Sequence, residues 1–338
     1  MSTRSDTAAG PPLIDLHRHL DGSIRLSTML DLAARHGLEL PGRTPAELRP
    51  HVQIDGAVGD LLAFLRRLDV MTSVLADAEA CRRVARENVE DARREGLAYL
   101  ELRFSPYFMG RAHRLDLGDV VGAVAAGARE ASAATGVKVK LIGILSRTFG
   151  PESCRRELDA LLAHRDELVA LDLAGDEKNW PAELFAEHFR RGRDAGWAIT
   201  VHAGEAGGAA SVWSALRELG ATRIGHGVRA VDDPRLLDHL AEHRIGLEVS
   251  LTSNVQTSTV PTLAAHPLRR FLERGLLATI NTDDPGISAV DLPHELEVAA
   301  PAAGLTPAQV VQAQWNAVEI AFLSPAEREA LRARAGRS

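Results

Sequence analysis

Short apolar runs alternate with longer amphipathic stretches along nearly the whole chain. Most of the short runs are continuously apolar rather than alternating, which is typical of parallel strands buried on both faces. They predict eight strands, at residues 13–17, 98–104, 139–145, 168–173, 198–202, 223–226, 246–250 and 278–283. Because a helical pattern follows each predicted strand, we expect an α/β fold of the (β/α)8 TIM-barrel type.

The stretches between the strands carry apolar residues on one side and charged residues on the other, as amphipathic helices do. The clearest lie at 78–95, 115–135, 151–164, 181–195 and 234–243. A doubly wound open sheet is the structural alternative, but no Gly-x-Gly-x-x-Gly turn follows an early strand. Since no repeat or linker divides the chain, we predict a disordered tail over 1–12 and one domain over 13–338.

A long helical insertion separates the first two predicted strands, from about residue 22 to residue 96. Within it, residues 61–71 read LLAFLRRLDVM and form an apolar helical patch. Two interpretations fit this patch: core packing against the barrel wall, or a lid over an active site built by the barrel's C-terminal loops. The pattern alone does not separate them.

Composition narrows the kind of ligand and the compartment. The 338 residues are 45% hydrophobic, which is enough for a large core, and the net charge of −7 gives no basic field for nucleic acid. We therefore expect a small-molecule substrate. Cys81 and Cys154 make no disulfide framework, and residues 1–12 lack the apolar core of a signal peptide. No run approaches the roughly 20 apolar residues of a membrane span, so we expect a cytoplasmic protein.

Reactive side chains follow four of the predicted strands at their C-terminal ends. The first strand leads into His17 and His19, and residues i and i+2 of an extended chain point the same way, so both imidazoles can converge on one ion. The others are His202 and Glu205 after strand five, His226 in strand six, and Asp283 and Asp284 after strand eight. Apolar residues precede each group, so we expect them to emerge from a dry core into one shared mouth.

These residue types indicate metal-assisted hydrolysis. Three neutral imidazoles and one carboxylate suit Zn²⁺ and leave room for a water, whose pKa the ion lowers. Glu205 lies three residues beyond His202, where it need not bind metal and can move protons. His226 either accepts a proton from the water or holds the hydroxide, and Asp283 can serve as both ligand and orienting base. The substrate stays open at this point.

Eight further histidines have no other reactive residues of this kind beside them in the sequence. They lie in helical or loop contexts away from the strand ends, and we expect them to be surface or capping residues. They are His36, His51, His113, His164, His188, His239, His243 and His266.

Taken in order, the motifs closely resemble those of the adenosine deaminases, in particular the bacterial branch. The segments that carry the resemblance run from about residue 13 to 323 in the family's order. They are IDLHRHLDGSI (14–24), YLELRFSP (99–106), KLIGILSRTFG (140–150), ALDLAGDE (170–177), TVHAGE (200–205), RIGHGV (223–228), LTSNVQTS (251–258) and INTDDPG (280–286).

The resemblance implies a TIM-barrel enzyme that uses one zinc ion per subunit to convert adenosine and 2′-deoxyadenosine to inosine and 2′-deoxyinosine with release of ammonia, a step of purine salvage. It implies that Glu205 protonates purine N1, while His226 and Asp283 orient and activate the hydroxide. The zinc ligands that it implies are His17, His19, His202 and Asp283.

The resemblance also implies a set of substrate-binding residues. His19 belongs to this set, Asp284 meets purine N7, the backbone N–H of Gly175 meets N3, and Asp21 receives the ribose 5′-hydroxyl. Related adenine deaminases usually carry the longer glutamate where this chain has Asp21, so the resemblance favours a nucleoside over the free base.

Alternative functions remain open in the sequence. One is deamination of another 6-aminopurine, such as adenine or an aminodeoxyfutalosine-type nucleoside. Another is a non-catalytic barrel, which the intact Glu205, His226 and Asp283 argue against. The cytidine-deaminase signature of His-x-Glu with Pro-Cys-x-x-Cys is absent. The segment 251–258 differs from the animal enzymes, and we expect it to alter the ribose side of the pocket.

Overall fold

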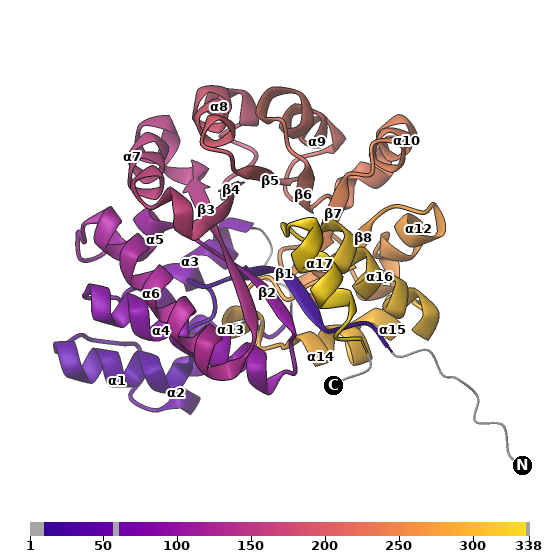
Figure 1. The fold of residues 1–338 in the computed structure, drawn as a ribbon. Coiled ribbons are helices and arrows are strands. Elements are labelled where there is room, and N and C mark those ends of the chain that lie inside the picture. The colour runs from indigo at the N-terminus through magenta and orange to yellow at the C-terminus, as the bar shows by residue number, and fades with distance from the viewer. Residues whose placement is uncertain (1–9, 57–60, 336–338) are drawn as a thin grey trace, which may run out of the picture.

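The computed structural model describes residues 10–56 and 61–335. Eight parallel strands form one sheet in the order β1 to β8, so each strand pairs with its neighbours along the chain (Figure 1). The predicted (β/α)8 barrel is therefore confirmed. The strands are β1 (Ile14–His19), β2 (Tyr99–Phe104), β3 (Lys138–Ser146), β4 (Leu168–Ala174), β5 (Ala198–Ala203), β6 (Arg223–His226), β7 (Gly246–Val249) and β8 (Ala278–Ile280).

The observed strand boundaries differ from the predicted ones mainly in the first and last strands. The last strand was expected to reach residue 283 but ends at Ile280. Of the predicted tail, residues 1–9 lie outside the described part of the chain, and Pro12 is already buried. The single-domain organisation stays a prediction, although all eight strands belong to one sheet.

The barrel closes between its last and first strands through a single bridge at the predicted site. Arg18 and Asp283 form this parallel bridge. The backbone N–H of His19 donates to the Asp283 carbonyl at 2.7 Å, and the N–H of Asp283 donates to the His17 carbonyl at 2.8 Å. The hydrogen bonds that close the barrel thus also fix the spacing of three predicted ligands.

Helices surround the sheet and bury their apolar sides against it. Val84 of α4 and Val121 of α6 are fully buried, for example, and belong to the main core. Among the helices described, none is long and apolar enough to cross a membrane. The outer helices are α4 (Ala78–Arg94), α6 (Leu117–Thr135), α7 (Gly150–Ala163), α8 (Ala186–Asp194), α9 (Ala209–Ser214), α10 (Pro234–Glu242), α12 (Leu268–Glu273) and α16 (Pro307–Ile320).

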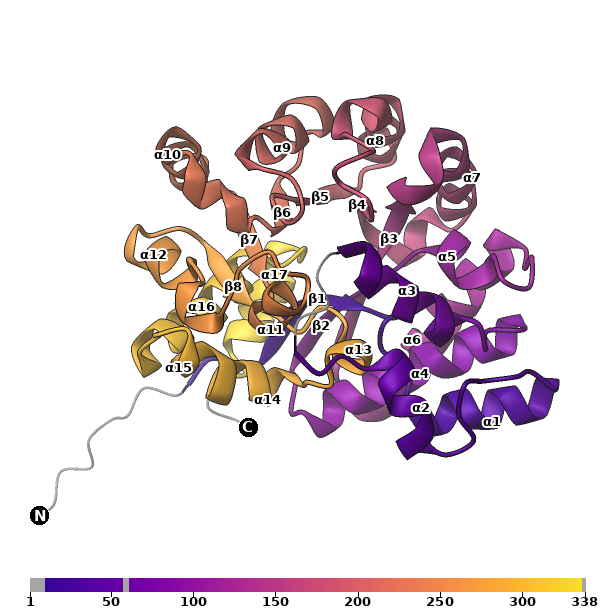
Figure 2. The same ribbon diagram turned by 180° about the vertical axis from the view of Figure 1, so that it is seen from behind.

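The remaining helices lie in the insertion and at the two ends of the barrel. Figure 2 shows α3, α11 and α13 together at one end, and Figure 1 shows α17 at the other. They are α1 (Leu26–His36), α2 (Pro45–Val52), α3 (Leu61–Thr72), α5 (Pro106–Gly110), α11 (Leu251–Gln256), α13 (Pro285–Ser288), α14 (Leu292–His294), α15 (Ala300–Ala302) and α17 (Pro325–Arg332).

The interior of the barrel below the strand ends is shielded from solvent, but several of its side chains are charged. Glu101, Arg103, Asp172 and Glu248 are 0% exposed, and Arg223 is 1% exposed. Arg223 forms ion pairs with both Glu101 and Glu248. Burying charges without partners is very costly, so these groups occur as a connected network rather than singly.

Candidate active site

A cavity opens at the C-terminal ends of the strands, where the sequence places the reactive side chains. Helix α3 forms one wall of it through Phe64, Leu65 and Leu68. Phe64 and Leu68 also belong to the main apolar core. Core packing of the described part of 61–71 is therefore confirmed, and these side chains also line the cavity, while the lid stays a prediction. The titratable side chains of the lining are His19, Asp21, His202, Glu205, His226, Asp283 and Asp284.

Two predicted ligands, His17 and His202, are held by buried carboxylates. His17 Nδ1 lies 2.7 Å from Glu248 Oε2, and His202 Nδ1 lies 3.0 Å from Asp172 Oδ2. A carboxylate only accepts hydrogen bonds, so each ring carries its proton on Nδ1 and keeps a lone pair on Nε2. Arg103 lies 2.7 Å from Asp172 and 2.5 Å from Glu248. Burial opposes ionisation of Asp172, but His202 and Arg103 hold its pKa well below the ordinary value.

Several acceptor atoms converge on one point in the cavity floor. His17 Nε2 lies 3.1 Å from Asp283 Oδ1 and has no hydrogen-bond partner among the described residues. His19 Nε2 lies 3.1 Å from His202 Nε2 and 3.3 Å from Asp283 Oδ1. Burial lowers the pKa of His19, but the carboxylates of Asp284 and Asp283 outweigh it and raise the value to about 9. The site thus favours positive charge, and its donor set fits a divalent metal ion.

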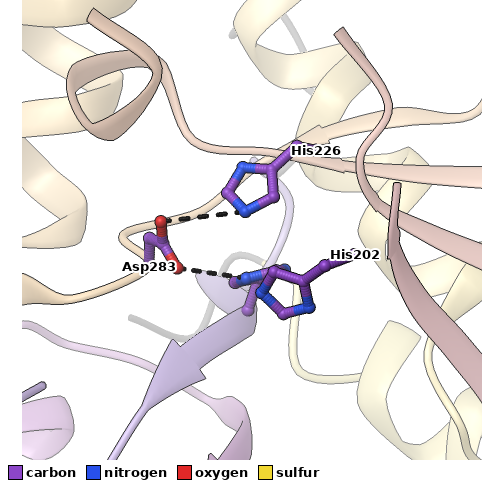
Figure 3. Close-up of side chains that lie close together, drawn as sticks. His202, His226 and Asp283 are labelled. Atoms are coloured by element: carbon purple, nitrogen blue, oxygen red, sulfur yellow. Dashed lines mark ion pairs between the residues drawn. The ribbon is translucent and has the colours of Figure 1, made fainter. Parts of the chain in front are cut away.

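Distance alone does not decide which side chains would hold the ion. Asp283 faces the His226 ring, with His202 close by (Figure 3). His226 and Asp283 both adopt left-handed backbone conformations, with φ of 60° and 66°, which non-glycine residues adopt rarely and mostly at functional sites. The possible ligand atoms form two groups, and the atoms within each group all lie within 4.8 Å of one another. One group is His17, His202, His226 and Asp283, and the other is His19, Asp283 and Asp284.

Two carboxyl groups of the cavity have raised pKa values. Burial raises the pKa of Glu205, and Asp283 and Glu177 add to the rise, whereas His226 opposes it. Burial also raises the pKa of Asp284 well above its ordinary value, and Asp283 adds to this shift against the opposing effect of His19. Both groups can therefore donate a proton or a hydrogen bond to a ligand.

Glu177, which the sequence analysis did not single out, fixes the loop that carries Glu205. Its carboxylate accepts hydrogen bonds from the N–H groups of Gly204 (2.6 Å), Glu205 (3.2 Å), Ala206 (2.7 Å) and Gly207 (2.7 Å). Glu177 is 6% exposed, so water cannot readily replace it. The glycine-rich sequence after His202 was the available signal, because consecutive N–H groups can wrap one anion.

Replacing Glu177 with glutamine should loosen this loop. The amide offers one acceptor oxygen and turns an NH₂ group toward backbone donors, and each lost hydrogen bond to a charge is worth about 1.5–3 kcal/mol. We expect a lower thermal midpoint, faster hydrogen exchange over residues 203–207 and a lower kcat. Glu183→Gln is the matched control, because Glu183 is exposed and its carboxylate accepts a hydrogen bond from the Ser214 hydroxyl rather than from this loop. Unchanged exchange over 203–207 would refute this role of Glu177.

The predicted substrate-binding residues line the same cavity. Asp21 and Asp284 each have a buried Oδ1 without a hydrogen-bond partner among the described residues. Gly175 has φ of 108°, and a Cβ there would lie 2.3 Å from Thr148 Oγ1. A side chain at position 175 is therefore excluded by conformation and by contact.

The segment 251–258 lies against the site, and its effect on the ribose side of the pocket stays a prediction. Thr257 lines the cavity, Ser253 Oγ donates to Asp283 Oδ2 at 2.6 Å, and Asn254 lies against His226. His266, one of the eight histidines expected at the surface or at a helix end, does cap α12 but is only 4% exposed and contacts Asn254. No local pattern indicated these contacts.

The fold and site define a barrel hydrolase with a His/Asp cluster able to hold a metal ion. The chain belongs to the adenosine deaminase family, whose profile matches residues 12–336. An adenosine deaminase of Edwardsiella ictaluri is 60% identical over 95% of this chain and 96% of its own length. One of Salmonella typhi is 59% identical over the same shares of the two chains.

Solved structures share the fold over nearly the whole chain. The adenine deaminase from Arthrobacter aurescens has a TM-score of 0.90 at 28% identity and covers 97% of this chain and 98% of its own. An amidohydrolase from Burkholderia ambifaria with bound Zn has a TM-score of 0.88 at 28% identity, covering 97% and 90% of the two chains.

Proposed function

We propose that this protein hydrolyses adenosine and 2′-deoxyadenosine to inosine and 2′-deoxyinosine, with release of ammonia. The observation that supports this proposal most strongly is that one cavity gathers three imidazoles and Asp283 with two carboxyl groups, Glu205 and Asp284, whose pKa values are raised. Family membership and the names of relatives about 60% identical to this chain support the same reaction.

The ion that this site would hold is one Zn²⁺. The ligands would be His17, His19, His202 and Asp283, since the Nε2 atoms of the three rings and Asp283 Oδ1 face one another. The similar Burkholderia ambifaria structure with bound Zn supports this choice. When bound, the ion would lower the pKa of a water and supply hydroxide near neutral pH.

The protein's own groups bind and orient the purine. Asp284 donates its carboxyl proton in a hydrogen bond to N7, and Gly175, whose missing side chain allows close approach, meets N3 through its N–H. Asp21 accepts from the ribose 5′-hydroxyl with its free, buried Oδ1. The apolar wall of Phe64, Leu65 and Leu68 covers the ligand and keeps bulk water away.

Proton movements then complete the hydrolysis. Glu205 gives its proton to N1 as the water oxygen bonds to C6, which becomes tetrahedral. Asp283 takes one proton of the attacking water and passes it to the amino group, which leaves as ammonia. The hydroxyl left on C6 loses its proton to Glu205 as the carbonyl forms, so both carboxyl groups return to their starting states. The overall balance is adenosine plus water to inosine plus ammonia.

A second candidate is deamination of adenine or of a larger nucleoside such as aminodeoxyfutalosine. The structural similarity to the Arthrobacter aurescens adenine deaminase favours testing it. The higher identity to adenosine deaminases, together with the short Asp21, favours adenosine.

Absorbance assays with the purified enzyme decide between these substrates. We expect kcat/KM for adenosine and 2′-deoxyadenosine to exceed that for adenine and aminodeoxyfutalosine by roughly 10³-fold or more, because a site built around a ribose hydroxyl rejects a ligand that leaves its polar groups unpaired. Activity should fall with a chelator and return with Zn²⁺. A preference for either competitor would overturn the proposal.

A further inference from the structure

A chain of buried hydrogen bonds runs from a backbone amide to His226. The N–H of Leu268 donates to His266 Nδ1 at 3.1 Å. His266 Nε2 lies 3.1 Å from Asn254 Oδ1, and Asn254 Nδ2 lies 3.0 Å from His226 Nδ1. The three side chains are 4%, 0% and 1% exposed in this order, so water does not compete for these contacts.

The backbone amide fixes the direction of every hydrogen bond in the chain. An amide N–H can only donate, so His266 Nδ1 holds a lone pair and its proton lies on Nε2. That proton is donated to the oxygen of Asn254, which leaves the Asn254 NH₂ group to donate to His226 Nδ1. Burial lowers the pKa of His266 to about 3, which keeps this ring neutral.

His226 therefore differs from His17 and His202 in the position of its proton. The Nδ1 atoms of His17 and His202 face the carboxylates of Glu248 and Asp172, which place the proton on Nδ1 and the lone pair on Nε2. His226 Nδ1 instead faces an N–H donor, which places the proton on Nε2. The three rings lie in one cluster, yet their partners prepare them for opposite roles.

We propose that Asn254 and His266 are positioning residues that hold His226 in the Nε2–H form, so that it donates a hydrogen bond into the site. The inference rests on the proposed function. His226 Nε2 lies 3.6 Å from Glu205 Oε2 and 3.9 Å from Asp283 Oδ2, beside the groups assigned to proton transfer.

Two consequences separate this role from those left open by the sequence. A ring with a proton on Nε2 has no lone pair there, so His226 is not a metal ligand despite its proximity to the cluster. A second proton would have to enter at Nδ1, against the N–H of Asn254. His226 thus orients the attacking water, and Asp283 receives the water's proton.

Nitrogen-15 NMR of the zinc-loaded enzyme measures the ring protonation directly. We expect His226 to show a protonated Nε2 and an unprotonated Nδ1, and His17 and His202 to show the reverse; single-histidine variants assign the signals. A protonated Nδ1 on His226 would overturn the proposal. This measurement needs no substrate, so it does not depend on the enzyme's activity. A wild-type enzyme inactive on adenosine would refute the proposed function but would not change the protonation read by NMR.

The Asn254→Asp variant should reverse the tautomer. A carboxylate accepts from both histidines, so the His226 proton should move to Nδ1, and kcat for adenosine should fall by about 100-fold with KM nearly unchanged. A lower kcat with the proton still on Nε2 would refute the assigned cause, as would an unchanged kcat.

His266 offers a matched pair of variants. In His266→Gln the side-chain amide can still donate to Asn254 and accept from the Leu268 N–H, so kcat should stay close to the wild-type value. His266→Leu fills a similar space with an apolar side chain but loses the donor to Asn254, so kcat should fall. Equal kcat values in the two variants, at similar thermal midpoints, would contradict the relay.

Discussion

The Glu205→Gln variant is expected to lose turnover by about 10²- to 10⁴-fold while keeping its zinc, because glutamine preserves the shape of the side chain but has no acidic proton for purine N1. The buried position of Glu205 suits a group that donates a proton. Glu205 is 7% exposed, and burial raises its pKa, which makes it a better proton donor at a given pH above its ordinary pKa. Steady-state kinetics with adenosine, together with elemental analysis for zinc, measure both parts of the prediction.

The same substitution at an exposed glutamate provides the control. Glu218 lies outside the cavity lining and is exposed, so Glu218→Gln should leave kcat and KM unchanged. If Glu205→Gln retained near wild-type turnover, Glu205 could not be the group that protonates N1. If it lost zinc as well, its effect would lie in the metal site instead.

Replacing His202 with alanine should lower the affinity for zinc by at least about 100-fold, since even removing a group that only supports a ligand costs 10- to 100-fold. His226→Ala should retain zinc. The two rings lie in the same donor cluster, but the first has a free Nε2 lone pair and the second has a proton there. Elemental analysis after dialysis against a weak chelator compares the two variants directly.

The two variants test whether the position of the ring proton, rather than closeness to the cluster, decides which histidine binds zinc. Full zinc content in His202→Ala would remove His202 from the ligand set. Loss of zinc from His226→Ala, at an unchanged thermal midpoint of the metal-free protein, would place His226 among the ligands and contradict the tautomer assigned to it.

Much of the fold could be predicted because its signals are local. A buried parallel strand is mostly apolar on both faces, so a run such as the one that ends at His202 marks a strand by itself, and β5 begins at the predicted Ala198. The end of that strand was visible for the same reason, since His202 interrupts the run. The prediction made the short β8 too long. Asp283 forms one bridge to Arg18 but does not continue the strand, and the sequence does not distinguish these two cases.

The supporting residues were not predictable, since their partners are remote in the chain. Glu248 and Asp172 appear as isolated charges within apolar runs, and only the barrel brings Glu248 to His17 across 231 positions. Glu177 likewise binds amides of a loop 27 to 30 residues away. The apolar residues before the strand ends did not indicate these charges, which are buried as pairs with Arg103 and Arg223.

The sequence by itself determined the eight strands, the reactive groups at their ends and, through its resemblance, the family. The tertiary structure decided the protonation states on which the chemistry depends. A histidine's residue type does not say which nitrogen carries the proton; that choice belongs to the group facing the other nitrogen. For His17 and His202 that group is a carboxylate, and for His226 it is the amide of Asn254. These neighbours come together only when the barrel closes, because hydrogen bonds act over about 3 Å and not along the chain.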